Sequence, residues 1–239
     1  MYLPCNNSAE QLTAAAGSGG PRRNVRIGRK RRTFGMHSAA DRPVQHVEED
    51  CAMRVITGSA RGRRLKELEG METRPTTDRV KEGLFNVLQF DIEGRKVLDL
   101  FAGTGQLGIE CLSRGAASAV FVDRRPDAVS LAKENLKLCN LTDRARVVAG
   151  DSMEFLKSVR EKYDLVFLDP PYQTDLLETA IAHIARHDLL SVHGMMIAEH
   201  PVDKSLPALS APYRMGRTYR YGKIAVTIYH RDGDGEAEV

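Results

Sequence analysis

From Val97 onward, short apolar runs alternate with stretches of helical spacing, and this alternation restricts the possible folds more than any other feature of the chain. Strands that are separated by helices of about 10–15 residues form βαβ units, which build a parallel sheet covered on both faces. We therefore predict an α/β protein with a doubly wound, Rossmann-like sheet. The expected parallel strands are Val97–Leu100, Ala119–Val122, Arg146–Ala149, Leu165–Leu168 and Met195–Ala198.

Capping and turn residues predict where the helices between these runs begin and end. An acidic residue followed by a second one three positions later has the spacing of a capping box, and proline is tolerated in a first helical turn. Glycine commonly ends a helix. We expect caps at Thr76 or Thr77, at Asp151 with Glu154 and at Asp175 with Glu178, a first-turn proline at Pro126 and a helix end at Gly115.

A hairpin is expected at each end of the alternating region. Arg54–Leu68 predicts two short strands around a turn that contains glycine, which would form an N-terminal β-hairpin extension. Near the other end, Tyr213–Tyr219 and Lys223–His230 predict a closing hairpin around a Tyr-Gly pair. These last two strands bring the expected sheet to seven.

The basic excess of the chain is confined to its first part. Met1–Ala52 holds 8 basic and 5 acidic residues, whereas Met53–Val239 holds 27 of each. Because the first part shows no helical or strand period, we expect it to be a disordered basic leader. Four interpretations of this segment stay open: a solvated tail, a nucleic-acid tether, a localisation signal, or a start-site artefact upstream of Met53. The remainder is expected to comprise a hairpin arm (53–72), the α/β domain (73–231) and an acidic tail (232–239).

Several classes of protein are disfavoured by composition. No run approaches the roughly 18 apolar residues of a membrane helix, and the start lacks the pattern of a secretory signal. The cysteines show no CxxC spacing, which argues against a disulfide framework or a zinc ribbon and favours a reducing cytoplasm. His183 and His187 lie four positions apart without a third ligand, so we expect surface histidines and no metal site. The cysteines are Cys5, Cys51, Cys111 and Cys139.

A glycine-rich turn follows the first expected strand. Gly103, Gly105 and Gly108 have G-x-G-x-x-G spacing, which permits a tight turn and a close approach of the backbone to a ligand. Asp99 stands at the end of the strand, where a carboxylate would repel a pyrophosphate. It suits instead a cationic ligand such as the amino acid portion and sulfonium of S-adenosylmethionine.

Acidic residues also follow the next two strands. Asp123 stands where a carboxylate can accept hydrogen bonds from both hydroxyls of a ribose, although a strand-end cap is the structural alternative. Asp151-Ser152 follows the third strand, where a side-chain oxygen and a backbone N–H can contact an adenine edge. A simple helix cap is the alternative there, and the two roles are compatible.

The most specific motif is Asp169-Pro170-Pro171-Tyr172, directly after the fourth strand. An exocyclic amine is a poor nucleophile that must be held with its lone pair directed at the methyl group. The Asp169 carboxylate and the Pro170 carbonyl can each accept one N–H, and two prolines stiffen the turn. Tyr172 offers a face on which a flipped-out base can stack, which contributes about 1–3 kcal/mol. A rigid turn with an exposed acid is the structural alternative.

These residues resemble a known group of enzymes. Asp169–Tyr172 resembles the catalytic motif of amino-group methyltransferases, which act on adenine or guanine amines and on glutamine amides. Arg54-Val55-Ile56, Arg61-Gly62-Arg63 and Arg74–Glu82 closely resemble the RsmD family of bacterial 16S rRNA guanine-N2 methyltransferases. The resemblance extends from Met53 to about Arg231. The family does not normally carry a segment like 1–52, and it more often has a glycine pair at Thr57-Gly58.

The resemblance implies a class I methyltransferase fold and a set of site residues. Asp169, Pro170, Pro171 and Tyr172 would hold the guanine as the catalytic group. Arg74, Thr76 and Thr77 would close the pocket beside the methyl donor. The S-adenosylmethionine site would be lined by Asp99, Phe101, Gly103, Gly105, Asp123, Asp151 and Ser152.

Basic residues cluster in both hairpins. A segregated group of this kind is typical of a surface that contacts a phosphate backbone, with solvated surface arginines as the alternative. In the arm the candidates are Arg61, Arg63, Arg64 and Lys66, to which we add Arg79 as a further RNA contact. The closing hairpin repeats the pattern with Arg214, Arg217, Arg220, Lys223 and Arg231.

The sequence therefore favours a cytoplasmic, monomeric enzyme that transfers a methyl group from S-adenosylmethionine to the N2 amine of a guanine in 16S rRNA, either as free RNA or in the assembling 30S subunit. Two alternatives stay open. An adenine-N6 DNA methyltransferase could use the same motif, although such enzymes usually need an extra recognition segment. A nucleic-acid-binding protein could keep the fold without the activity. A nicotinamide-dependent dehydrogenase would leave Asp99 and the Asp-Pro-Pro-Tyr turn unexplained.

Overall fold

The computed structural model describes residues 53–68, 75–171 and 174–233, and for residues 75–79 the backbone only. The predicted basic leader lies outside these residues, as do positions 69–74 and all but the first two positions of the predicted acidic tail.

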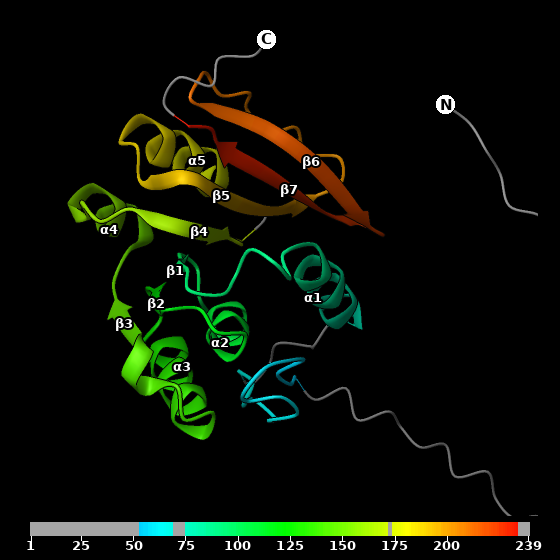
Figure 1. Ribbon diagram of the computed structural model, residues 1–239, viewed down its shortest axis with the longest axis vertical. Coiled ribbons are helices and arrows are strands. Elements are labelled where there is room, and N and C mark those ends of the chain that lie inside the picture. The colour runs from blue at the N-terminus through cyan, green and yellow to red at the C-terminus, as the bar shows by residue number, and fades with distance from the viewer. Residues whose placement is uncertain (1–52, 69–74, 172–173, 234–239) are drawn as a thin grey trace, which may run out of the picture. The chain divides into compact units, whose positions relative to one another are not determined.

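The described chain forms one seven-stranded sheet, as predicted. The strand order is β3-β2-β1-β4-β5-β7-β6, with β1 to β5 parallel and β7 antiparallel to both β5 and β6 (Figure 1). The strands are β1 (Lys96–Asp99), β2 (Ser118–Asp123), β3 (Ala145–Ala149), β4 (Tyr163–Leu168), β5 (Leu190–Pro201), β6 (Tyr213–Tyr221) and β7 (Ile224–Arg231). The helices are α1 (Pro75–Val87), α2 (Gln106–Ser113), α3 (Pro126–Leu138), α4 (Ser152–Ser158) and α5 (Leu176–Arg186), with a 3-10 turn at Thr142–Arg144.

Most predicted element boundaries agree with the structure to within one or two residues, and the exceptions have local causes. Strand β5 begins at Leu190 rather than Met195; its first five residues mix apolar and polar types and include His193 with a positive φ, so they lack the continuous apolar run used to predict the strand. Helix α1 begins at Pro75, so the caps predicted at Thr76 or Thr77 are wrong. Pro126 occupies the first turn of α3 and Gly115 follows α2, as predicted.

The two predicted capping boxes differ in outcome. The Asp151 carboxylate accepts hydrogen bonds from the backbone N–H groups of Met153 and Glu154, so it caps α4 as predicted. The capping box predicted at the start of α5 is wrong, because Asp175 makes no cap hydrogen bond with its side chain. Its intended partner Glu178 instead forms an ion pair with Lys204, at 2.8 Å.

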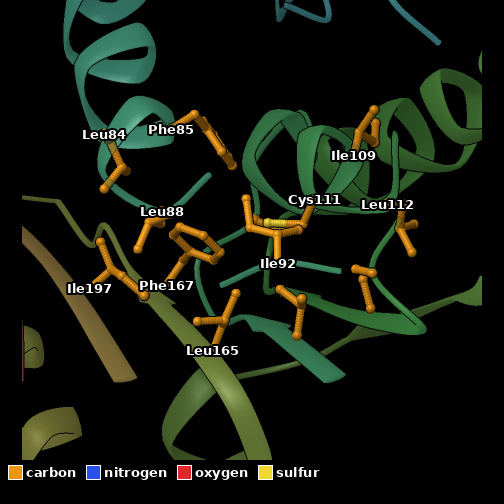
Figure 2. Packing of buried hydrophobic residues seen from close by; sticks show 14 of the residues in the cluster. Leu84, Phe85, Leu88, Ile92, Ile109, Cys111, Leu112, Leu165, Phe167 and Ile197 are labelled. Carbon is orange, nitrogen blue, oxygen red and sulfur yellow. The ribbon is translucent and has the colours of Figure 1, made fainter. Parts of the chain in front are cut away.

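Two hydrophobic cores form on the opposite faces of the sheet. Helices α1, α2 and α3 lie on one face, and α4 and α5 lie on the other (Figure 1). In the first core, the rings of Phe85 of α1 and Phe167 of β4 lie 6.1 Å apart between centroids, and Ile109 of α2 belongs to the same core (Figure 2). Alternate residues of each central strand point to opposite cores, so Leu165 and Phe167 enter the first core and Val166 and Leu168 the second.

The arm, residues 53–68, is a paired segment with little regular strand. Its two halves meet in one isolated antiparallel bridge, Arg54–Arg64, instead of the two predicted strands. The reason is that Ile56 and Thr57 donate their backbone N–H groups to the carboxylate of Glu110 on α2, at 2.7 and 3.0 Å, rather than to a partner strand.

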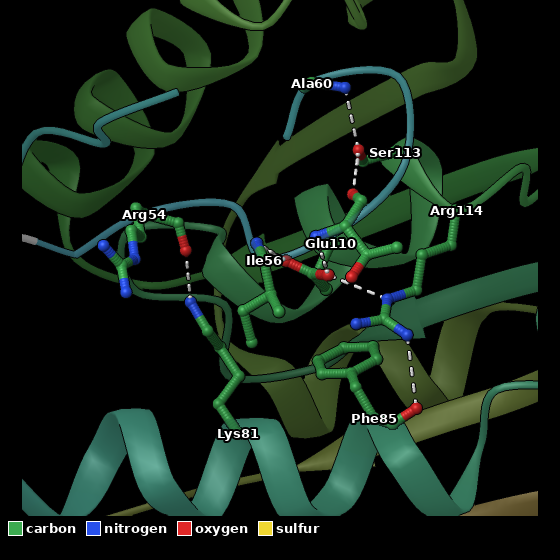
Figure 3. A network of polar contacts seen from close by, with 9 residues as sticks. Arg54, Ile56, Ala60, Lys81, Phe85, Glu110, Ser113 and Arg114 are labelled. Atoms are coloured by element: carbon green, nitrogen blue, oxygen red, sulfur yellow. Dashed lines mark hydrogen bonds and ion pairs between the residues drawn. The ribbon is translucent and has the colours of Figure 1, made fainter. Parts of the chain in front are cut away.

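Further polar contacts hold the arm to α1 and α2 (Figure 3). Ser113 donates its hydroxyl to the Thr57 carbonyl and accepts the N–H of Ala60. Lys81 of α1 donates to the Arg54 carbonyl at 2.7 Å. Gly58 has a φ of +88°, and a Cβ atom there would lie 1.9 Å from the Ser113 carbonyl oxygen, so the turn requires glycine at this position.

The closing hairpin forms as predicted, but two of its basic residues have structural roles. Arg231 is buried and its guanidinium binds the Asp188 carboxylate, with the Nε atom at 2.7 Å. Arg214 pairs with Asp232 at 2.9 Å. The interpretation of these two arginines as phosphate contacts is therefore wrong for Arg231 and weakened for Arg214.

Of the two histidines expected at the surface, His187 is exposed and His183 is half-buried. Cys111 and Cys139 are buried free thiols. The rings of His183 and His187 lie 4.2 Å apart, and no group of three or more potential metal ligands occurs among the described residues. Within the same residues, no helix has the length and apolar character needed to cross a membrane.

Candidate active site

Acidic side chains from four neighbouring strands meet at the carboxyl edge of the sheet. Asp99 ends β1, Asp123 ends β2, Asp169 follows β4 and Glu199 lies near the end of β5. The negative charges of Glu199 and Asp99 act on Asp169, and that of Asp123 acts on Asp99. The structure thus brings together the three aspartates predicted from sequence and adds Glu199, which sequence reasoning did not include in the site.

Asp99 is a buried acid that supports the start of α2. Its side chain is nearly inaccessible to solvent, and its Oδ2 atom accepts the backbone N–H of Gly108 at 3.1 Å, in the first turn of the helix. Burial raises the pKa of Asp99 to about 7, the Gly108 hydrogen bond opposes this, and the charge of Asp123 raises the pKa further. A cation beside Asp99 would lower the free-energy cost of ionising the buried carboxyl group, which fits the predicted sulfonium donor.

The glycine loop between β1 and α2 is held in a strained backbone conformation that glycine tolerates. Gly103 and Gly105 have φ values of +52° and +81°. Gly103 donates its N–H to Asp123 Oδ2 at 2.8 Å, and Arg125 donates its N–H to Asp123 Oδ1 at 2.9 Å. Each carboxylate oxygen has a second lone pair, so both can still accept a hydroxyl, as the ribose prediction requires.

The third glycine of the motif has a packing role. A Cβ atom at Gly108 would lie 2.3 Å from the ring of Phe121 on β2, so glycine lets α2 pack closely against the sheet. Phe101, which was predicted to line the cofactor site, is half-buried and packs against the second core.

Asp151 and Ser152 are both engaged in local structure. Asp151 caps α4, and the buried Ser152 donates its hydroxyl to the Leu100 carbonyl at the end of β1, at 2.7 Å. Gly150 and Asp151 also line an open groove of about 500 Å³ along β3 and α4. The cap interpretation of this pair is confirmed, and a contact with adenine stays a prediction.

Asp169 lies half-buried at the start of the motif loop, with Pro170 buried and Pro171 exposed. Burial raises the pKa of Asp169 well above its ordinary value, and the charges of Glu199 and Asp99 raise it further. The far side of the loop is tied down, because Thr174 donates its hydroxyl to the Pro171 carbonyl and Lys204 donates to the Thr174 carbonyl.

His200 is a structural residue. It is buried, its Nε2 atom contacts the Thr227 hydroxyl at 2.9 Å and its Nδ1 atom contacts the Pro201 carbonyl at 2.8 Å. Burial lowers the pKa of His200. Both ring nitrogens are therefore engaged in contacts within the fold.

The remaining predicted site residues are placed only in part. Arg74 and Tyr172 lie outside the described residues, and Thr76, Thr77 and Arg79 lie in the first two turns of α1, where only the backbone is described. In the arm, Arg61, Arg63 and Arg64 are exposed. Lys66 is exposed as well, but its ammonium pairs with Glu134 at 2.7 Å.

Comparison with known proteins identifies the family. The model of the family described as "Conserved hypothetical protein 95" matches residues 53–230. The chain belongs to this family. The match begins at Met53, the first residue of the arm, and ends one residue before the expected end of the α/β domain.

Curated relatives of this chain are named as methyltransferases. "Putative rRNA methyltransferase YlbH" of Bacillus subtilis (strain 168) is 41% identical over 184 residues, which span 76% of this chain and 100% of YlbH. "Ribosomal RNA small subunit methyltransferase D" of Escherichia coli (strain K12) is 36% identical over 186 residues, which span 78% of this chain and 93% of the relative.

Solved structures share the fold. "Putative methyltransferase yhhF from Escherichia coli" superposes with a TM-score of 0.69 at 33% identity and covers 76% of this chain and 98% of its own. An RNA methyltransferase from Salinibacter ruber, solved with S-adenosyl-L-homocysteine, shares the fold at 17% identity with a TM-score of 0.51, covering 67% of this chain and 95% of its own. The predicted class I methyltransferase fold is confirmed, and the comparisons agree with S-adenosylmethionine as the cofactor.

The raised pKa of Asp99 predicts a pH-dependent affinity for the methyl donor. Below about pH 7 the free protein keeps a proton on this carboxyl, and a cation must displace it. The affinity for S-adenosylmethionine should therefore rise between about pH 6 and pH 8, by at most about tenfold per unit for each proton released. Isothermal titration across this range measures the effect. S-adenosylhomocysteine, which lacks the sulfonium charge, is the matched control and should show a smaller rise; a flat profile for S-adenosylmethionine would contradict the assignment.

Proposed function

We propose that this protein transfers a methyl group from S-adenosylmethionine to the exocyclic N2 amine of a guanine in 16S rRNA. The observation that carries the proposal is the position of Asp169, which lies in the same acidic cluster as Asp99 and Glu199 at the carboxyl edge of the sheet. An acceptor for an amine N–H is thereby close to carboxylates that favour a cationic donor. The names of two relatives, one an rRNA and one a small-subunit rRNA methyltransferase, support RNA as the substrate.

The roles of the motif follow from the chemistry of an aromatic amine. The Asp169 carboxylate and the Pro170 carbonyl each accept one N–H, which directs the nitrogen lone pair toward the methyl group. As the N–C bond forms, the C–S bond breaks and its electron pair stays on sulfur. The methylated nitrogen is then cationic, and a carboxylate at Asp169 stabilises this positive charge until the nitrogen releases one of its two protons to water. Tyr172 provides the surface on which the guanine stacks.

Ionisation of Asp169 depends on the donor. In the free protein, burial and the neighbouring acids favour the protonated carboxyl, which can accept fewer hydrogen bonds. A cationic donor at this edge favours the ionised form instead. A cationic donor at this edge and an ionised Asp169 carboxylate therefore favour each other.

The arm supplies the RNA contact in this proposal. Arg61, Arg63 and Arg64 are exposed on one paired segment, and the contacts of that segment with α1 and α2 fix its place beside the domain. Arginine side chains on a fixed support suit phosphate groups, which they bind without reading the sequence. The substrate, whether free 16S rRNA or an assembling 30S subunit, would be held by this surface, and the enzyme would act as a monomer.

Replacement of Asp169 tests the proposal. Asp169→Asn keeps the size of the side chain but removes the negative charge, so methyl transfer to 30S subunits should fall by about 100-fold or more, whereas donor affinity should fall much less. Incorporation of labelled methyl groups measures the rate, and isothermal titration measures donor binding. Asp175→Asn, which changes an exposed carboxylate further along the same loop, is the matched control and should keep full activity. Full activity of Asp169→Asn would refute the catalytic assignment.

Removal of the arm charges should weaken RNA binding selectively. The triple change Arg61→Ala, Arg63→Ala and Arg64→Ala should reduce the slope of log affinity against log salt by about 2, since about three phosphate contacts are lost. Filter binding of 16S rRNA over a salt series measures the slope, while donor affinity without RNA should not change. Arg186→Ala, an exposed arginine on α5, is the control. An unchanged RNA affinity at moderate salt would exclude the arm as the contact surface.

A further inference from the structure

Asn135 of α3 joins the arm to the glycine loop. Its side chain is fully buried, and its amide is bonded on both sides. The Oδ1 atom accepts the backbone N–H of Lys66 at 2.8 Å, and the Nδ2 atom donates to the Lys66 carbonyl at 3.1 Å. The same Nδ2 atom donates to the carbonyl of Thr104 at 3.0 Å.

The two bonds to Lys66 resemble those of a neighbouring β-strand. A primary amide presents one donor and one acceptor side by side, as a backbone residue does in a sheet. Asn135 therefore pairs with the second half of the arm in place of a strand. Because all of its donors and its acceptor are engaged, loss of this side chain would leave the N–H and carbonyl groups of Lys66 unpaired in a partly buried position.

The third bond reaches the loop that is expected to bind the cofactor. Thr104 lies between Gly103 and Gly105, which both have positive φ values, so the direction of its carbonyl group reports the conformation of the whole turn. The Thr104 hydroxyl makes a second contact with the arm, to the sulfur of Met53 at 3.5 Å. The loop thus touches both halves of the arm, once through Asn135 and once directly.

The arm behaves as one unit in these contacts. Met53 donates its N–H to the Glu67 carboxylate at 2.7 Å, and the Leu65 N–H binds the Met53 carbonyl at 2.8 Å. On its other side, the arm is bound by Glu110 and Ser113 of α2 (Figure 3). Among the described contacts, those of Asn135 and Met53 are the ones that connect the arm to the glycine loop.

We propose that Asn135 is a positioning residue through which RNA bound on the arm strengthens cofactor binding at the glycine loop. The inference rests on the proposed function, since it takes the arm as the RNA surface. RNA and cofactor would each favour the same hydrogen-bonded arrangement of Lys66, Asn135 and Thr104. The coupling is therefore positive, and it acts equally in both directions.

The test measures S-adenosylhomocysteine binding to the full chain by equilibrium dialysis, with and without saturating 16S rRNA. For the unaltered protein, RNA should tighten S-adenosylhomocysteine binding by about fivefold or more. In Asn135→Ala, S-adenosylhomocysteine binding without RNA should weaken. The ratio of S-adenosylhomocysteine affinity with RNA to that without RNA should fall to about one. Ser113→Ala is the matched control, because it loosens the arm from α2 without touching the glycine loop, and it should keep the ratio of the unaltered protein.

The outcomes distinguish a failure of the coupling between RNA and cofactor from a failure of the proposed function. If filter binding shows that 16S rRNA does not bind, the proposed function fails and the coupling with it. If RNA binds but the ratio for the unaltered protein is one, only the coupling is overturned, and this measurement needs no variant to fold. A purely structural role would lower the melting temperature of both variants and leave both ratios unchanged, which would also overturn the proposal.

Discussion

Repulsion between carboxylates at the ends of neighbouring strands is the constraint on which the rest of this structure depends. Asp99 is buried within the field of Asp123, and Asp169 within the fields of Asp99 and Glu199. Such a cluster is unfavourable unless backbone N–H groups, retained protons or a cation offset the charge. The N–H groups of Gly103 and Gly108 offset part of the negative charge of the cluster, and a sulfonium donor would offset more of it. Residues 53–239 hold 27 basic and 27 acidic residues, so the placement of charge carries the functional signal rather than its sum.

Helix α2 links the two halves of the proposed mechanism. Its first turn donates to Asp99 at the cofactor edge, and its close approach to the sheet requires the glycine at position 108. Its last turn holds the arm through Glu110 and Ser113. The surface proposed to bind RNA and the loop proposed to bind the donor are thus fixed to the same helix, and Asn135 of α3 adds a second connection between them.

The features that could be predicted from sequence are those with a local signal. The apolar runs and the turn residues predict seven strands, and the acids directly after the strands predict the edge at which Asp99, Asp123 and Asp169 meet. Pairings between distant residues carry no such signal. Arg231 was interpreted as a surface charge because nothing near it in sequence shows that Asp188 binds it, and Asn135 lies in an ordinary helical pattern. Glu199 was not included in the site because the expected fifth strand ended at Ala198, and nothing near it in sequence shows that this carboxylate lies close to Asp169.

The identity of the methylated nucleoside tests the central claim most directly. Purified protein would be incubated with labelled S-adenosylmethionine and either 30S subunits, free 16S rRNA or duplex DNA, and the digested nucleosides would be separated and identified by mass spectrometry. The account predicts label in N2-methylguanosine from the ribosomal substrates and none in DNA. Label in N6-methyladenine from duplex DNA, or no transfer to any RNA, would contradict it.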